Sequence, residues 1–225
     1  MRAHRDPPHK VRGLSLCEER VESRSGPCQH PLRVAGDWDD SLRVTTDHWL
    51  QRVARVPSPN CDDRPDPDDI SLIVVHGISL PPGKFGGDWI ARLFTNRLPR
   101  RLPAALEELR STRVSAHLLI DRRGRTKQFV PFHRRAWHAG VSHWRGRSAC
   151  NDFAVGIELE GTDERPYTAA QYRRLRGVCE ALFARYPDLS PATVVGHNEI
   201  APGRKTDPGP AFDWSRLLLT LPFGP

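Results

Sequence analysis

The chain has 225 residues, of which 38% are hydrophobic, and a formal net charge of +7. This length favours one domain of ordinary size with a tail. Basic residues are interleaved with acidic ones and form no long run, which argues against a nucleic-acid-binding protein despite the charge.

The longest apolar runs, such as residues 72–75, are far too short to span a membrane. The charged N-terminus contains no apolar segment, so we identify no signal peptide. The cysteines are odd in number and form no CxxC pair, which argues against a disulfide framework or a thiolate zinc cluster. Reduced thiols fit best, and we expect a cytoplasmic protein. The five are Cys17, Cys28, Cys61, Cys150 and Cys179.

The first part of the chain, residues 1–43, mixes both charge signs with Pro, Gly and Ser and shows no periodicity. It is interpreted as a disordered extension, or as sequence upstream of the true start codon. A short amphipathic segment (47–53) and a loop rich in Pro and Asp (57–69) follow. Residues 70–76, ISLIVVH, then predict a buried strand because of their β-branched run.

Two helices are predicted next. One follows Asp88 as N-cap, and another begins at Pro103 as its first residue. Residues 117–120 and 127–132 then resemble two strands of a hairpin. The connecting segment DRRG supplies Gly124 for a turn that needs positive φ.

A further strand is predicted over residues 152–160, and the clearest helix over 169–186. Thr168 and Gln171 form a capping box at the start of this helix. Tyr167 and Tyr172 occupy the positions of a hydrophobic staple. An apolar stripe along the helix includes Cys179, which we interpret as a core residue.

The last elements are a strand over 192–195, a long loop over 198–210 and a helix with Asp213 as N-cap. Strands and helices alternate without strict βαβ regularity. The fold class is therefore α/β, a single domain with a mixed central β-sheet covered by helices.

Two histidines stand where buried strands meet loops, His76 after LIVV and His197 after VVG. A histidine in such a place is more often a hydrogen-bonded surface residue than a ligand. Asp207, ten residues after His197, is the best candidate for a third ligand. Two imidazoles and a carboxylate suit Zn²⁺ and leave one position for water. Spacing alone leaves this zinc site one hypothesis among others.

Five long segments resemble the AmpD-type N-acetylmuramoyl-L-alanine amidases, within the wider zinc amidase and peptidoglycan-recognition superfamily. The resemblance covers residues 46–222, and the five motifs occur in the family's order, so the signal is specific. The motifs are VVHGISLPPGKFGG (74–87), RVSAHLLIDRRG (113–124), QFVPFHRRAWHAGVS (128–142), CNDFAVGIELEGTD (150–163) and GHNEIAPGRKTDPGP (196–210).

The resemblance implies zinc as cofactor and the bond between N-acetylmuramic acid and L-alanine as the scissile amide. It implies a small muropeptide as substrate, often with an anhydro sugar, and a role in cell-wall recycling. No nucleic acid or membrane partner is expected, and we expect a monomer. The implied residues are the zinc ligands His76, His197 and Asp207, the catalytic residues Glu158 and Lys205, and the substrate-binding residues Arg113 and Trp137.

The residues alone leave some of these roles open. Glu158 and Glu160 share one face of a strand, and the pattern does not choose between them. Lys205 is one of only four lysines in an arginine-rich chain, which favours a specific role, but it could also be solvated. Trp137 could equally belong to the core. His138 could line the cleft, without a second metal.

The chain departs from the family's usual residues at two positions that we expect near the substrate. Gly77 replaces the usual asparagine after the first ligand, and Ala149 replaces a frequent arginine. Three alternatives remain: a peptidoglycan-binding module without activity, an amidase that acts on intact periplasmic wall, and a cysteine hydrolase using Cys150. The complete set of ligands favours an enzyme over a binding module.

Overall fold

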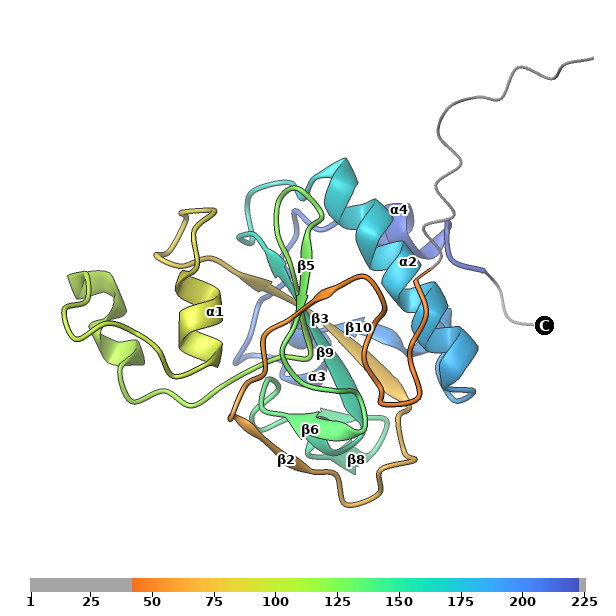
Figure 1. The fold of residues 1–225 in the computed structure, drawn as a ribbon. Helices are drawn as coiled ribbons and strands as arrows, with labels where there is room; N and C mark the ends of the chain where they lie inside the picture. Colours follow the sequence, from red (N-terminus) through yellow and green to blue (C-terminus); the bar gives the residue numbers. More distant parts are fainter. Residues whose placement is uncertain (1–41, 223–225) are drawn as a thin grey trace, which may run out of the picture. The chain divides into compact units, whose positions relative to one another are not determined.

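The computed structural model describes residues 42–222. Its main sheet has six strands in the order β1-β5-β4-β9-β3-β10 (Figure 1). All neighbouring strands are parallel except β4 and β5, so the sheet is mixed, as predicted. The strands are β1 (Ala54–Arg55), β3 (Leu72–Ile78), β4 (Leu118–Ile120), β5 (Thr126–Gln128), β9 (Ala154–Glu160) and β10 (Val194–Gly196).

The neighbouring strands β3 and β9 lie inside the sheet, are its longest strands and are almost entirely buried. Both are rich in β-branched and other apolar residues, which suits strands covered on both faces. β3 does not end at His76, as the sequence predicted, but continues to Ile78 because all of its residues pair with β9. In this register His76 lies directly beside Glu158.

Side-chain alternation along β3 separates two hydrophobic clusters on the two faces of the sheet. Ile73 and Val75 belong to the larger cluster, which contains the apolar stripe of helix α2 (Ala169–Arg185). Leu72 and Val74 belong to a second cluster, together with Ile200 of helix α3. His76 continues this second row, so the alternation directs its side chain to the α3 face.

Helix α2 confirms the strongest helical prediction. Thr168 Oγ1 accepts from the Gln171 N–H at 3.2 Å, and Gln171 Oε1 accepts from the Thr168 N–H at 3.0 Å. Cys179 is fully buried, as a core residue should be. α2 packs with α4 (Trp214–Leu218) on the same side of the sheet (Figure 1). The Asp213 carboxylate caps α4 by accepting from the Arg216 N–H at 3.0 Å, as predicted.

The predicted hairpin is formed by β4 and β5. Gly124 adopts φ of 78°, and its N–H donates to the Asp121 carbonyl at 2.9 Å. The second strand ends at Gln128 rather than at residue 132. The Phe129 N–H still donates to the His117 carbonyl, but the chain then bonds to an earlier segment: the Phe132 N–H donates to the His48 carbonyl.

Two predicted helix starts differ in detail. Asp88 precedes α1 (Trp89–Phe94) but makes no capping bond, because its carboxylate pairs with Arg92 at 2.8 Å. Pro103 precedes the helical segment rather than opening it, and residues Ala104–Leu109 form a 3₁₀ helix.

Three expected regions begin or end elsewhere. Residues Pro191–Thr193 form a 3₁₀ turn, and β10 starts only at Val194. The expected strand over 152–160 starts at Ala154, because Cys150–Asp152 form another 3₁₀ turn. The predicted loop after His197 opens instead as the short helix α3 (His197–Ile200).

Most of residues 1–43 lies outside the described part of the chain. The described part begins with Leu42, which is only 7% exposed and packs into the larger cluster. Two small antiparallel pairs complete the fold, β2 (Cys61–Asp63) with β6 (Arg134–Ala136) and β7 (His143–Trp144) with β8 (Arg147–Ser148). Among the described residues, no helix has the length and apolar character needed to cross a membrane.

Candidate metal centre and active site

The three predicted ligands come from three neighbouring segments. Val75 of β3 pairs with Gly196 of β10 in parallel, so the next residues, His76 and His197, emerge side by side. Asp207 is far along the following loop, but its carbonyl accepts from the Asn198 N–H at 3.0 Å. This bond returns the loop to the start of α3 and places the carboxylate beside both rings.

The three side chains present one atom each to a common point. His76 Nδ1 and His197 Nδ1 are 2.9 Å apart, and Asp207 Oδ2 lies 3.3 Å from the first and 3.1 Å from the second. Ligands of a tetrahedral zinc ion with bonds of about 2.0–2.2 Å stand roughly 3.3 Å apart. The spacing and the donor atoms therefore fit a divalent metal ion, and the three residues form a possible metal site.

Electrostatics agree with this interpretation. Burial lowers the pKa of His76 to about 4, so its imidazole is neutral and able to act as a ligand at neutral pH. Burial by itself would raise the pKa of Asp207, but the hydrogen bonds with His197 and His76 lower it by more. The pKa of Asp207 falls well below its ordinary value, and the carboxylate is ionised.

Glu158 and Glu160 differ sharply in their surroundings. Both carboxylate oxygens of Glu160 are engaged in hydrogen bonds, because they accept from the backbone N–H groups of Gly86 and Arg122. Glu158 is 9% exposed, and its Oε2 is buried without a partner among the described residues. Burial, reinforced by the charge of Asp207, raises the pKa of Glu158 well above its ordinary value. A basic carboxylate beside His76 is therefore available to exchange a proton.

Lys205 is exposed and lies two residues before Asp207. Its positive charge lowers the pKa of both His76 and Glu158, which places its field at the candidate site. The two predicted substrate-binding residues lie elsewhere. Trp137 is half-buried, and its indole N–H donates to Asp62 at 3.0 Å. Arg113 is exposed and bonds to nearby backbone carbonyls, with no described contact to the three ligands.

The structure shows contacts to the two histidine ligands that the sequence did not identify. His138 Nδ1 lies 2.9 Å from Nε2 of His76, and the Ala139 carbonyl lies 3.2 Å from Nε2 of His197. The sequence signal was the contiguous motif WHAG, but nothing in it indicated which atoms would meet the ligands. The Arg204 guanidinium also donates to the Ala139 carbonyl at 2.7 Å.

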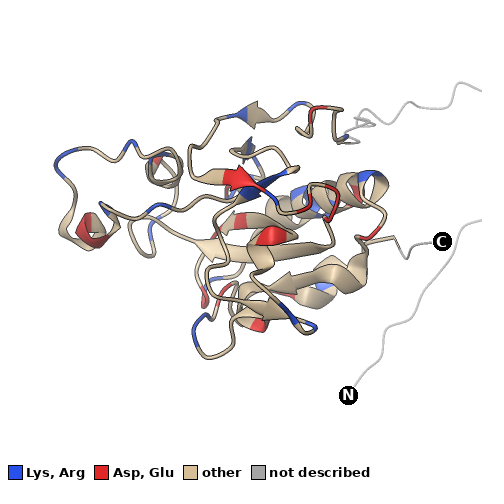
Figure 2. Ribbon diagram, turned by 90° about the horizontal axis from the view of Figure 1, so that it is seen from below, with Lys and Arg blue, Asp and Glu red and all other residues tan. Residues whose placement is uncertain are grey.

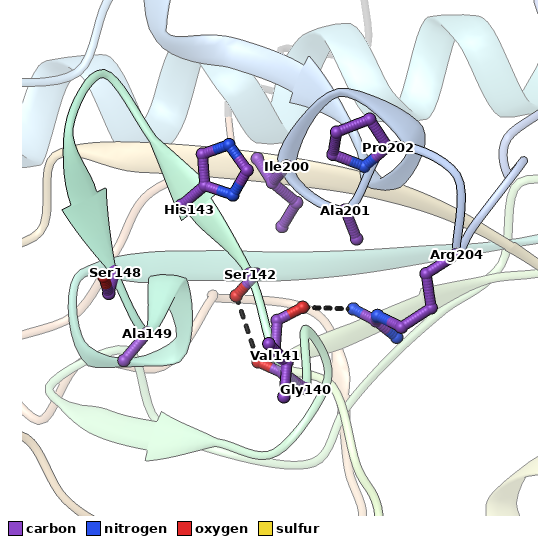
Figure 3. A pocket seen from close by; sticks show the side chains of 10 residues that line it. All are labelled: Gly140, Val141, Ser142, His143, Ser148, Ala149, Ile200, Ala201, Pro202 and Arg204. Atoms are coloured by element: carbon purple, nitrogen blue, oxygen red, sulfur yellow. Dashed lines mark hydrogen bonds between the residues drawn. The ribbon is translucent and has the colours of Figure 1, made fainter.

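An open cavity of about 700 Å³ lies beside Arg204 (Figure 3). Residues 140–149 form one wall and residues 200–204 the other. Arg204 donates to the Val141 carbonyl across it, while the Val141 side chain is 88% exposed. Ala149 also lines the cavity. This is the position at which the family resemblance predicts an arginine.

Two alternatives gain no support from the described residues. Cys150 is fully buried, and burial raises the pKa of its thiol, which opposes nucleophilic activation. Cys61, Cys150 and Cys179 are free thiols, while Cys17 and Cys28 lie outside the described part. Basic and acidic positions are interspersed along the ribbon rather than sorted onto a basic stripe (Figure 2).

Residues 66–210 match the family described as N-acetylmuramoyl-L-alanine amidase. The 1,6-anhydro-N-acetylmuramyl-L-alanine amidase AmpD of Escherichia coli K12 is 56% identical over 173 residues, covering 77% of this chain and 94% of that protein. The crystal structure of an Se-Met AmpD derivative superposes with a TM-score of 0.76 at 53% identity, covering 78% of this chain and 98% of that one.

A more distant structure carries a ligand. AmpDh3 of Pseudomonas aeruginosa, in complex with anhydromuramic pentapeptide, is 30% identical with a TM-score of 0.50. The match covers 66% of this chain and 58% of that one. This chain belongs to the N-acetylmuramoyl-L-alanine amidase family, and within that family to the AmpD type of anhydro-N-acetylmuramyl-L-alanine amidases.

Proposed function

We propose that this protein is a zinc-dependent hydrolase of the amide between 1,6-anhydro-N-acetylmuramic acid and L-alanine in muropeptides. The observation that carries the proposal is the convergence of three metal-ligand atoms beside an unpartnered buried carboxylate. His76, His197 and Asp207 would hold the zinc ion, and Glu158 stands next to His76 on the neighbouring strand. The two functions, metal binding and proton exchange, are thus assigned to different groups.

Zinc, when bound, supplies a water of lowered pKa and polarises the scissile carbonyl. The protein's own residues do the rest. Glu158 Oε2 takes the proton from the attacking water and returns it to the alanine nitrogen as that nitrogen leaves. Its raised pKa favours this role, because a more basic carboxylate accepts a proton more readily near neutral pH. No covalent intermediate is required.

Lys205 provides the positive charge that stabilises the developing oxyanion. Its influence on the pKa of both His76 and Glu158 supports a position near the reacting groups. For substrate binding we propose Trp137 as an aromatic surface for the sugar and Arg113 as a contact for the acidic peptide stem. We further propose that the functional domain spans residues 46–222.

The proposed substrate is a recycled fragment rather than intact wall, and the proposed compartment is the cytoplasm. The resemblance to AmpD supports the first, because AmpD is named for the anhydro sugar. The second is proposed because recycled fragments are the expected substrate. We expect the amidase to be a monomer. We expect it to need no nucleic-acid or membrane partner. A substrate comparison decides the first point: the enzyme should release peptide from the soluble anhydro-muropeptide much faster than from intact sacculi.

The decisive experiment is product analysis by mass spectrometry with 1,6-anhydro-N-acetylmuramyl tripeptide. The wild-type protein should release free tripeptide and anhydro sugar. Chelation should abolish release and added Zn²⁺ should restore it, and Asp207→Ala should be inactive. Glu158→Gln should bind zinc normally but lose about 10²–10⁴-fold in kcat. The matched control is Glu180→Gln, which changes a partly exposed glutamate paired with Arg176 and should retain full activity.

Two results would overturn the proposal. A folded, zinc-loaded wild-type protein that leaves the muropeptide intact but still binds it would instead be a binding module. Full activity of Glu158→Gln would remove this carboxylate from the chemistry while leaving the metal site in place.

A further inference from the structure

Two consecutive residues contact both histidine ligands on the sides that face away from the metal position. His138 Nδ1 lies 2.9 Å from His76 Nε2, and the Ala139 carbonyl lies 3.2 Å from His197 Nε2. Each ligand ring thus offers Nδ1 to the metal and Nε2 to one of these residues. Such outer partners commonly fix the tautomer and the orientation of a metal-binding imidazole.

The tautomers follow from the donor and acceptor inventory. If His76 Nδ1 carries the lone pair for the metal, its proton resides on Nε2, which donates to His138 Nδ1. His138 must then carry its own proton on Nε2. That nitrogen is buried and has no partner among the described residues. A buried unpaired N–H is unfavourable. Within residues 42–222, the hydrogen bond to His76 is thus the one that orients the ring of His138.

The surroundings also hold His138 in place. Gly156 on β9 lies beneath the ring: a Cβ at this position would be 2.4 Å from His138 Cγ. Only glycine leaves room for the imidazole there. On the backbone side, Asn151 Oδ1 accepts the N–H groups of His138 at 3.2 Å and Ala139 at 2.8 Å. The motifs around 138, 151 and 156 are thus parts of one support.

We propose that His138 is a positioning residue, which accepts a hydrogen bond from Nε2 of His76 and so fixes the ring of this ligand toward the metal. The inference rests on the proposed function, because it requires that His76 binds the metal through Nδ1.

The first test measures zinc affinity, by competition with a chromophoric chelator, for the wild-type protein and three variants. His138→Ala removes the acceptor and should weaken zinc binding about 10–100-fold. In His138→Asn the acceptor Oδ1 is bonded to Cγ, as Nδ1 is in histidine. Zinc affinity should therefore stay within about threefold of wild type. His143→Ala removes an exposed imidazole that lines the cavity and should change nothing.

The second test uses Gly156→Ala, which leaves every ligand and His138 intact. Its new methyl group must displace the imidazole, so zinc affinity should fall as it does in His138→Ala. In the His138→Ala background the obstacle is absent, and adding Gly156→Ala should cause no further loss. Visible spectra of the Co²⁺ form of each variant report the geometry at the metal separately from affinity.

The outcomes separate cleanly. Unchanged zinc affinity and an unchanged Co²⁺ spectrum in a folded His138→Ala protein would refute the positioning role alone. Equal losses in His138→Ala and His138→Asn would assign the residue to packing instead. Failure of the wild-type protein to bind zinc would remove the proposed metal site itself, and the inference with it. If His138→Ala does not fold, the comparison of His138→Asn with Gly156→Ala still decides.

Discussion

Substitution of Gly77 gives a sharp test of the structure around the first ligand. A Cβ at this position would lie 2.4 Å from the Tyr167 hydroxyl oxygen, but 3.5 Å from Pro208 Cα and 3.7 Å from Tyr167 Cζ. Only the hydroxyl is therefore too close. Tyr167 is 4% exposed, and its hydroxyl donates to the Pro208 carbonyl at 3.0 Å. Gly77→Ala must displace this buried group, and overpacking of this kind costs about 1–3 kcal/mol.

The magnitude can be isolated by removing the hydroxyl. Tyr167→Phe alone should cost about 1 kcal/mol, for one lost hydrogen bond. In that background the remaining contacts of the new methyl group are ordinary ones, so Gly77→Ala should cost almost nothing. The two substitutions should therefore be non-additive by about 1–3 kcal/mol, in the direction of relief.

Urea denaturation followed by circular dichroism, with a chelator in every sample, measures all four proteins. Gly177→Ala on α2 is the matched control, because a Cβ there would meet only Leu42 Cδ1 at 3.9 Å. It should stabilise the protein by about 0.5–1 kcal/mol with or without the Tyr167 hydroxyl. Additive effects of Gly77→Ala and Tyr167→Phe would refute the reasoning, since they would mean that the hydroxyl does not limit this position.

Three further predictions concern the scaffold. Arg64 is 4% exposed and donates to four backbone carbonyls, so Arg64→Leu should cost at least about 3 kcal/mol in urea denaturation. Burial lowers the pKa of His117 to about 3, so between about pH 6.5 and 3 the unfolded state binds the extra proton and stability falls as pH falls. His117→Gln should show a shallower fall in pH-dependent melting, and an identical slope would contradict this assignment. Thr168→Ala removes the capping bond to Gln171 and should cost about 1 kcal/mol in thermal or urea denaturation, whereas an unchanged midpoint would assign the cap no energetic role.

The fold elements that the sequence predicts best are those whose signal is local. Helix α2 combines a capping box with a long apolar stripe, and both features lie within the helix itself. The predictions failed where long-range contacts decide the boundary. β3 continues through His76 because β9 offers partners as far as Ile78, and the chain after Gln128 leaves its hairpin because an earlier segment provides other partners.

The same distinction applies to the site. The residues alone could nominate His76 and His197, since both follow apolar runs. They could not separate Glu158 from Glu160, because the two share a face of β9. The difference arises from loops distant in sequence, which bring the N–H groups of Gly86 and Arg122 to Glu160 and none to Glu158. Only the family resemblance supplied that choice in advance.

The adjacent residues Arg204 and Lys205 are both cationic, but we expect them to have different roles. The chain uses arginine at almost every basic position, yet lysine stands at 205. The Arg204 guanidinium donates to two backbone carbonyls, those of Ala139 and Val141. A forked donor suits this bridging role. By doing so it anchors the carbonyl that also faces His197. The proposed oxyanion partner needs the opposite property, a compact charge that is free of such bonds, and lysine provides it. We therefore predict that the two cations are not interchangeable: Arg204 holds the Ala139 carbonyl beside His197, and the role proposed for Lys205 requires an ammonium that faces the substrate.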